Sequence, residues 1–169
     1  WQAALRYFSP LLFFALGVAM AECIRMKYQK AQKIHWRQLV LVIEILLLFA
    51  VGFFPNEIDL LANAMVSFAC AMQVQAFRKV NGYAFASTMC IGNLRSGMES
   101  LCAYGKTKDK KILQKSGYYF GIIFLFAIGA ALGGHMIKYI GAKTIWISCL
   151  ILLISFLCMF IKEEKEEHP

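Results

Sequence analysis

The feature that most constrains this chain is a series of apolar stretches, each close to the length of a membrane-spanning helix. A helix needs about 20 residues to cross the hydrocarbon core of a bilayer. We expect spans at residues 5–24, 39–54, 58–77, 117–139 and 145–161. Apolar residues make up 60% of the chain and charged residues only 17%, which excludes an ordinary soluble domain. The sequence therefore predicts an all-α, polytopic membrane protein, with residues 1–169 forming a single integral membrane domain in the lipid bilayer.

The charged residues between these stretches predict how the chain is oriented. Residues 25–38 carry five Lys or Arg side chains and no acid, and residues 106–115 carry five lysines and one aspartate. Basic loops of membrane proteins remain on the cytoplasmic side. We therefore place both loops and the C-terminal tail, residues 162–169, in the cytoplasm. The net charge of +8 is confined to such clusters, which argues against a nucleic-acid-binding surface.

Residues 63–101 are the polar centre of an otherwise apolar chain. On a helical wheel of the third span, Asp59, Asn63, Ser67 and Cys70 share one arc, with Gln73 just beyond it. Leu61, Met65, Phe68 and Met72 lie opposite, and we expect that face to meet lipid. Alanines at 62, 64, 69 and 71 flank the polar arc and let neighbouring helices approach closely. Polar groups at this depth mark function by default, although they also join helices as structural hydrogen-bonding groups.

The segment at residues 83–104 is too polar and too rich in glycine for an ordinary span. Gly92 and Gly97 interrupt it, and Asn93, Arg95 and Glu99 follow the first interruption. We expect a broken, re-entrant helix whose second half starts near Asn93 and offers its N-terminal amides to an anion or a polar solute. The alternative is an amphipathic helix lying at the membrane surface after a turn.

Together these two segments predict a solute-binding site in the membrane. Its candidate residues are Asn63, Ser67, Gln73, Thr88, Asn93, Arg95 and Glu99. Glu44 lies inside the second span, where it either carries a coupling proton or extends to the nearby interface. His35, His135 and His168 are scattered, and the six cysteines form no metal-binding pair. We therefore predict no catalytic residues, no metal and no cofactor.

A repeated pattern relates the first and fifth apolar stretches. Residues 7–21 and 119–133 are identical at six of fifteen positions, which exceeds what a shared apolar composition explains. The loop charges give the two copies opposite directions, so we expect an inverted repeat, as many transporters have. The counterpart of the polar centre would then lie upstream of Trp1. Glycines at 117, 121, 129 and 133 form a ladder, which we expect to pack against another helix.

The motifs in the polar centre resemble a known family. Matching elements are the Gln and Ala of residues 72–76, then Arg78, Val80 and Gly82, the pair Ser87 and Thr88, and the run Ile91, Gly92, Asn93 and Leu94. This pattern is similar to the C-terminal signature of the YoaK-type family of uncharacterised bacterial multi-pass membrane proteins. Asn81 stands where that family usually has glycine, and Ser87 and Ile91 stand where it has threonine. The resemblance implies a place in the bacterial inner membrane and no particular substrate.

Two classes of function remain open. The first is a transporter or channel for a small polar solute, favoured by the repeat, the broken segment and the polar face. The second is a membrane scaffold or partner subunit that transports nothing, favoured by the weakness of every ligand-binding signal. An assembly of identical chains is compatible with both. An enzyme is not expected, because no nucleophile or carboxylate pair has a recognisable context.

Overall fold

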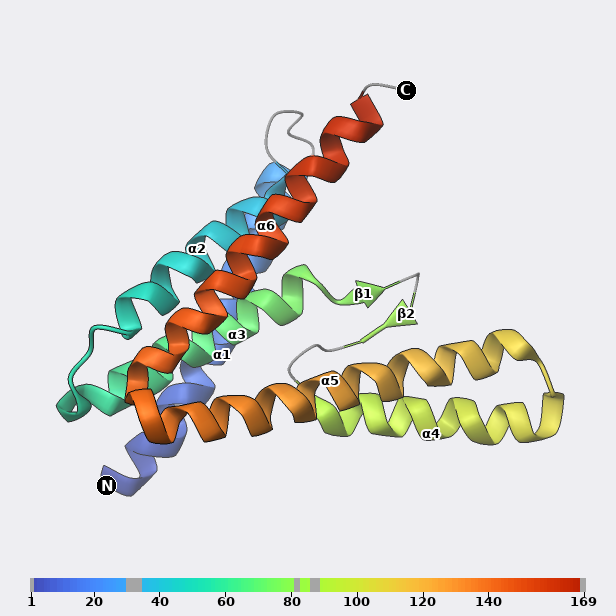
Figure 1. The fold of residues 1–169 in the computed structure, drawn as a ribbon, viewed down its shortest axis with the longest axis horizontal. Coiled ribbons are helices and arrows are strands. Elements are labelled where there is room, and N and C mark those ends of the chain that lie inside the picture. The colour runs from blue at the N-terminus through green and yellow to red at the C-terminus, as the bar shows by residue number, and fades with distance from the viewer. Residues whose placement is uncertain (1, 30–34, 81–82, 86–88, 168–169) are drawn as a thin grey trace. The chain divides into compact units, whose positions relative to one another are not determined.

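The computed structural model describes residues 2–29, 35–80, 83–85 and 89–167, and it is almost entirely helical (Figure 1). The elements are α1 (Gln2–Tyr28), α2 (Trp36–Val51), η1 (Asn56–Ile58), α3 (Asp59–Ala76), β1 (Lys79–Val80), β2 (Tyr83–Ala84), α4 (Cys90–Thr107), α5 (Lys110–Ile140), η2 (Gly141–Thr144) and α6 (Ile145–Glu167). The all-α class is confirmed, since the only strands in the described ranges are two residues long. The chain divides into two compact units. The first unit comprises residues 1–76 and 137–169, and the second comprises residues 77–136.

The first unit is a helical bundle in which α1 packs mainly on α3 (Figure 1). Gly17 permits this contact, because a Cβ atom at that position would lie 2.4 Å from the Phe68 carbonyl oxygen and 2.8 Å from the Ala71 Cβ. Ala21 and Ala71 are both fully buried. Small residues thus bring the two backbones into close approach, as the alanines of α3 led us to expect.

Helix α2 packs on both α3 and α6 in this unit. The Trp146 indole Nε1 donates a hydrogen bond to the Phe49 carbonyl oxygen at 3.3 Å, and its ring stacks near Phe49 and Phe53. Gly52 leaves room for this ring, since a Cβ there would lie 2.0 Å from Nε1. Farther along the pair, the Cys149 thiol donates to the Ile45 carbonyl oxygen at 3.9 Å. An aromatic cluster therefore closes one end of the α2–α6 contact.

The second unit consists of the antiparallel β1–β2 pair and the helical hairpin α4–α5. Gly97 on α4 faces α5, where a Cβ would lie 3.2 Å from the Tyr119 Cβ. The buried Ser116 hydroxyl donates to the Gly97 carbonyl oxygen at 2.9 Å. The Tyr119 hydroxyl donates to the Ala84 carbonyl oxygen at 2.7 Å. These contacts hold β2, α4 and the first half of α5 together.

The prediction of a helix broken at Gly92 is wrong. Helix α4 runs without interruption from Cys90 and contains both Gly92 and Gly97. A glycine inside a helix costs only about 1 kcal/mol relative to alanine, and at Gly97 the close approach of α5 explains its presence. The chain turns earlier, in the β1–β2 pair, whose connection includes the Asn81-Gly82 dipeptide outside the described residues.

The basic loop expected at residues 106–115 is also mostly helical. Helix α4 continues to Thr107 and α5 starts at Lys110. Only Lys108 and Asp109 connect them, and Lys108 adopts the left-handed conformation with φ of 54°. The Asp109 carboxylate accepts a hydrogen bond from the Lys111 backbone N–H at 2.9 Å, which satisfies one of the free amides at the start of α5.

The face of α3 that we expected to meet lipid is partly a packing face. Met72 is fully buried, and the backbone of Phe68 contacts α1 at Gly17. Leu61 remains 46% exposed. The wheel identified the polar arc, but the hydropathy of a residue does not tell whether lipid or another apolar helix covers it. The glycine ladder of α5 also differs from expectation, because within the described second unit no atom approaches the Cβ positions of its glycines to within 4 Å.

Two apolar segments are long enough to cross a membrane, Arg6–Tyr28 and Lys110–Met159. The first coincides with most of α1 and the second contains α5 and the greater part of α6. In the apolar stretch of the first segment only 17% of the residues are buried by the protein itself, and in that of the second only 11%. Their apolar side chains are therefore available to a surrounding lipid phase.

Candidate functional site

The candidate site residues belong to two different helices. Asn63, Ser67 and Gln73 lie on α3 in the first unit, whereas Asn93, Arg95 and Glu99 lie on α4 in the second. Thr88 lies outside the described residues. On α3, Asn63 is exposed while Ser67 and Gln73 are half-buried.

On α4 the polar residues divide between two environments. Asn93 is 4% exposed and already has an interaction partner. Arg95 and Glu99 are exposed and form an ion pair, with the Arg95 Nε 2.9 Å from the Glu99 Oε1. The pairing of these two residues four apart on the helix is confirmed. An exposed ion pair of this kind adds little stability. Of these three residues, Asn93 is the one that lines a pocket.

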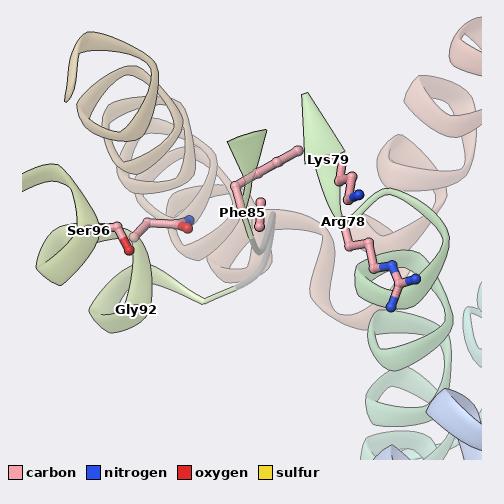
Figure 2. Close-up of a pocket in the computed structure, with 7 residues that line it drawn as sticks. Arg78, Lys79, Phe85, Gly92 and Ser96 are labelled. Atoms are coloured by element: carbon pink, nitrogen blue, oxygen red, sulfur yellow. The ribbon is translucent and has the colours of Figure 1, made fainter. Parts of the chain in front are cut away.

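Asn93 lines an open pocket of about 400 Å³ at the beginning of α4. The pocket is formed by Arg78, Lys79, Ala84, Phe85, Gly92, Asn93 and Ser96. Figure 2 shows Phe85 between the residues of α4 on one side and Arg78 and Lys79 on the other. The side chains of Arg78 and Lys79 both end on the side of Phe85 away from Ser96 in this view.

The described lining of the pocket offers backbone N–H groups and basic side chains, which favour electron-rich ligands. Among the described residues no side chain caps the N-terminus of α4, because Met89 at the N-cap makes no such hydrogen bond, and the first turn contains no acid. The amides of that turn therefore carry the positive end of the helix dipole without a side-chain acceptor. Nothing lies within 4 Å of the Cβ position of Gly92, so a ligand has room beside this turn. The described lining of the pocket includes two basic residues and no acid.

Of the described residues that line this pocket, the predicted site included only Asn93 and lacked the polar or aromatic side chains of Arg78, Lys79, Phe85 and Ser96. Arg78 was named only as a matching element of the family resemblance. The available signal was the Asn81-Gly82 dipeptide, which is typical of a two-residue hairpin turn. A hairpin there would bring the residues before the turn back toward those that precede α4.

A second polar cluster joins α1, α2 and α3 in the first unit. The Glu22 carboxylate accepts a hydrogen bond from the Gln75 Nε2 at 2.5 Å and pairs with Arg25. The Arg37 Nε donates to the Ala76 carbonyl oxygen at 3.2 Å, at the end of α3. From the sequence, Glu22 was not expected to have a role. The signal was an acid three residues before an arginine at the end of an apolar stretch.

Glu44 occupies the interior of the first unit. Its side chain is 1% exposed, so it does not extend to the surface of the bundle. Its Oε1 has no hydrogen-bond partner among the described residues. Cys70 on α3 interacts electrostatically with Glu44 and belongs to the polar arc of that helix. The Cys70 end of this arc therefore lies on the side of α3 that packs on α2.

Metal and disulfide chemistry have no visible basis in the described part of the chain. The six cysteines are free thiols. No three of the described His, Cys, Asp and Glu side chains are grouped as metal ligands. The site chemistry is thus that of amides, hydroxyls, lysine and backbone N–H groups.

The comparisons with known proteins bear on the family and on nothing finer. Neither the curated proteins nor the solved structures include a match to this chain. One family, described as "Protein of unknown function (DUF1275)", matches residues 1–158. That range contains both units almost completely, including the pocket and Glu44. The chain therefore belongs to the DUF1275 family.

Proposed function

We propose that this protein is a multi-pass membrane transporter or channel for a small polar solute, acting in the bacterial inner membrane with its C-terminus in the cytoplasm. The pocket at the start of α4 carries the proposal. It combines Lys79, the uncapped first turn of α4 and the side chains of Asn93 and Ser96. These groups donate hydrogen bonds, so the solute we propose is one that accepts them, such as a carboxylate or a polyol.

Several features of the chain support a place in the membrane. The two long apolar segments are mostly uncovered by the protein, and leucine, isoleucine and phenylalanine side chains dominate their exposed surface. A soluble protein rarely exposes apolar area on this scale. Five spans, with α2 and α3 shorter than the other three, remain our proposed topology.

A transport assay on the full chain in liposomes tests this function. Osmotic swelling followed by light scattering, with acetate, glycine, glycerol and urea as solutes, reports entry of each one. We expect Lys79→Gln and Ser96→Ala to slow entry of the accepted solute by about tenfold each, which corresponds to losing roughly one hydrogen bond worth 1.4 kcal/mol. Both residues lie in the pocket, and neither change removes buried apolar volume.

The matched control is Cys102→Ser, a change at an exposed position on the same helix. It should leave both swelling and thermal stability at the parental values. Asn93→Leu is a poorer probe, because Asn93 is buried and partnered, so its replacement also costs folding stability. Swelling no faster than in protein-free liposomes for every solute would count against transport.

A scaffold or partner subunit is the second candidate. The observation that favours it is the glycine ladder of α5, which presents a small-residue face with no neighbour in its own unit. Such faces associate with other membrane helices. Association of the purified protein with itself, measured by crosslinking in liposomes that show no solute entry, would favour this candidate.

A further inference from the structure

A single carboxyl group is enclosed in the helical bundle of the first unit. Glu44 lies eight residues after the first residue of α2, about 12 Å along the helix at a rise of 1.5 Å per residue. Its buried neighbours on the same helix, Val40, Leu41 and Leu48, are apolar. The side chain is 1% exposed, and its Oε1 accepts no hydrogen bond from the described residues.

The elements packed around Glu44 bring no cation to it. From α3 the facing group is the Cys70 thiol. On α6 the Cys149 thiol donates to the carbonyl oxygen of Ile45, the residue after Glu44. On α1, Glu22 and Arg25 pair with each other, and Glu22 also accepts a hydrogen bond from Gln75, five residues beyond Cys70 on α3. The other charged residues of α1, Arg6 and Lys27, are exposed.

The remaining charged and polar groups of α2 are also engaged elsewhere. Arg37 donates to the carbonyl oxygen that ends α3. Gln38 is buried and has a partner of its own. In the described part of the chain, the ion pairs are Glu22 with Arg25 and Arg95 with Glu99, so Glu44 takes part in neither.

An isolated carboxylate in such a place costs far more free energy than the neutral acid. Removing an ionised carboxylate from water costs several kcal/mol even after the protein relaxes, unless a cation or several donors replace the water. Cys70, which interacts with Glu44, belongs to the polar arc of α3. Acids enclosed among membrane helices mark ion pathways and proton relays. A buried acid that served packing alone would be replaced by an apolar residue at no loss.

We propose that Glu44 is a proton-binding site, which holds a proton as a carboxylic acid in the closed bundle and releases it to water when the bundle opens. The step is an acid–base exchange in which the O–H bond of the acid breaks, the electron pair stays on the carboxylate oxygen, and water takes the proton. The coupling of this exchange to solute movement rests on the proposed transport function.

Carbodiimide labelling of the full chain in liposomes tests the proton site directly. The O–H of a protonated carboxyl group adds across a C=N bond of dicyclohexylcarbodiimide, and acyl migration to nitrogen leaves a stable N-acylurea on the side chain. Mass spectrometry of peptides then locates the product. We expect Glu44 to be modified in preference to the exposed Glu57 and Glu99. Above the midpoint of its titration, modification should fall about tenfold per pH unit, because the protonated fraction does so.

Infrared spectroscopy gives a second measurement that does not depend on reagent access. The carbonyl stretch of a protonated carboxyl group should be present in the parent and absent from Glu44→Gln, which keeps the size and shape of the side chain. Cys70→Ala is the control, and it should retain the band with a shifted titration midpoint. A Glu44 that stays unmodified at every pH, in a protein whose infrared band does not change in Glu44→Gln, would overturn the proposal. A band that persists unchanged over all pH values at which the protein is folded would also overturn it, since no proton would then exchange.

Coupling and transport can fail separately. If Glu44 exchanges a proton but no solute enters the liposomes, the proton site is supported and the proposed transport function is not. If solute entry responds to a pH gradient in the parent and loses that response in Glu44→Gln, coupling is supported. If entry proceeds equally in both proteins regardless of the gradient, transport is supported and coupling is refuted.

Discussion

The contact of α1 with α3 allows a stability prediction in which two similar substitutions have opposite signs. In Gly17→Ala, the new methyl group would meet the Phe68 carbonyl oxygen at 2.4 Å and the Ala71 Cβ at 2.8 Å. Ordinary contact begins at 3.4 Å, so the helices must separate by about 1 Å, and the first obstacle is backbone that cannot rotate away. Overpacking of this kind costs about 1 to 3 kcal/mol.

Alanine also favours the helix itself, which offsets part of that cost. Gly→Ala inside a helix contributes about 1 kcal/mol of stability. The expected net loss for Gly17→Ala is therefore up to about 2 kcal/mol. In a chain of this length, each kcal/mol shifts the unfolding midpoint by about 2 to 4 °C. Thermal unfolding in detergent micelles, followed by tryptophan fluorescence, should show a midpoint lower than that of the parent.

Gly129→Ala is the matched variant, since Gly129 occupies the equivalent place in the repeated fifteen-residue pattern on α5. No atom of the second unit lies within 4 Å of its Cβ position. Only the helix-propensity term then acts, and the midpoint should rise by up to about 4 °C. A Gly17→Ala protein as stable as the parent would refute the described packing of α1 on α3. A Gly129→Ala protein destabilised like Gly17→Ala would mean that a helix from outside the second unit covers the glycine ladder.

Three further predictions concern other contacts and the orientation. Ser116→Ala should lower the free energy of unfolding by about 1 to 2 kcal/mol, because the buried Gly97 carbonyl loses the hydrogen bond from this hydroxyl. Ser155→Ala, at an exposed position on α6, is the control. Its free energy of unfolding should lie within about 0.5 kcal/mol of the parent value, as surface changes usually do. Gly52→Ala should destabilise the α2–α6 contact through its clash with Trp146, and Trp146→Phe in the same chain should restore part of the loss as judged by thermal unfolding. The orientation can be tested with single cysteines placed at Lys27, Lys108 or Glu164 in a chain whose native cysteines are replaced. None of them should react with a membrane-impermeant maleimide added outside intact cells. Reaction at any of the three positions would contradict the proposed orientation.

Hydropathy and charge predict the helical class and most helix positions of this chain, because those depend on the average character of long segments. The fine structure of residues 77–107 could not be predicted in the same way. Gly92 and Gly97 look alike in the sequence, yet one faces open space and the other faces Tyr119. What a glycine does depends on the helix that packs beside it, and that information is not local.

The candidate site was predictable only in part for a related reason. Asn93 was singled out and lines the pocket, while Lys79 and Phe85 reach it only through the hairpin that precedes α4. On α3, Met72 belongs to the same apolar series as Leu61, but one is buried by helices and the other is exposed. A hydrophobic pattern cannot separate these two environments when lipid and protein interior are equally apolar.

The length of α5 has a mechanical consequence for the pocket. The helix has 31 residues, so it is about 46 Å long, whereas the hydrocarbon core is about 30 Å thick. If residues 117–139 cross the bilayer, the first turns of α5, around Lys110 and Lys111, extend into the headgroup region. Next to these turns, the Ser116 and Tyr119 hydroxyls are hydrogen-bonded to the backbone of α4 and β2. A change in the tilt of α5 would therefore move the start of α4, with Asn93 and Ser96, together with α5.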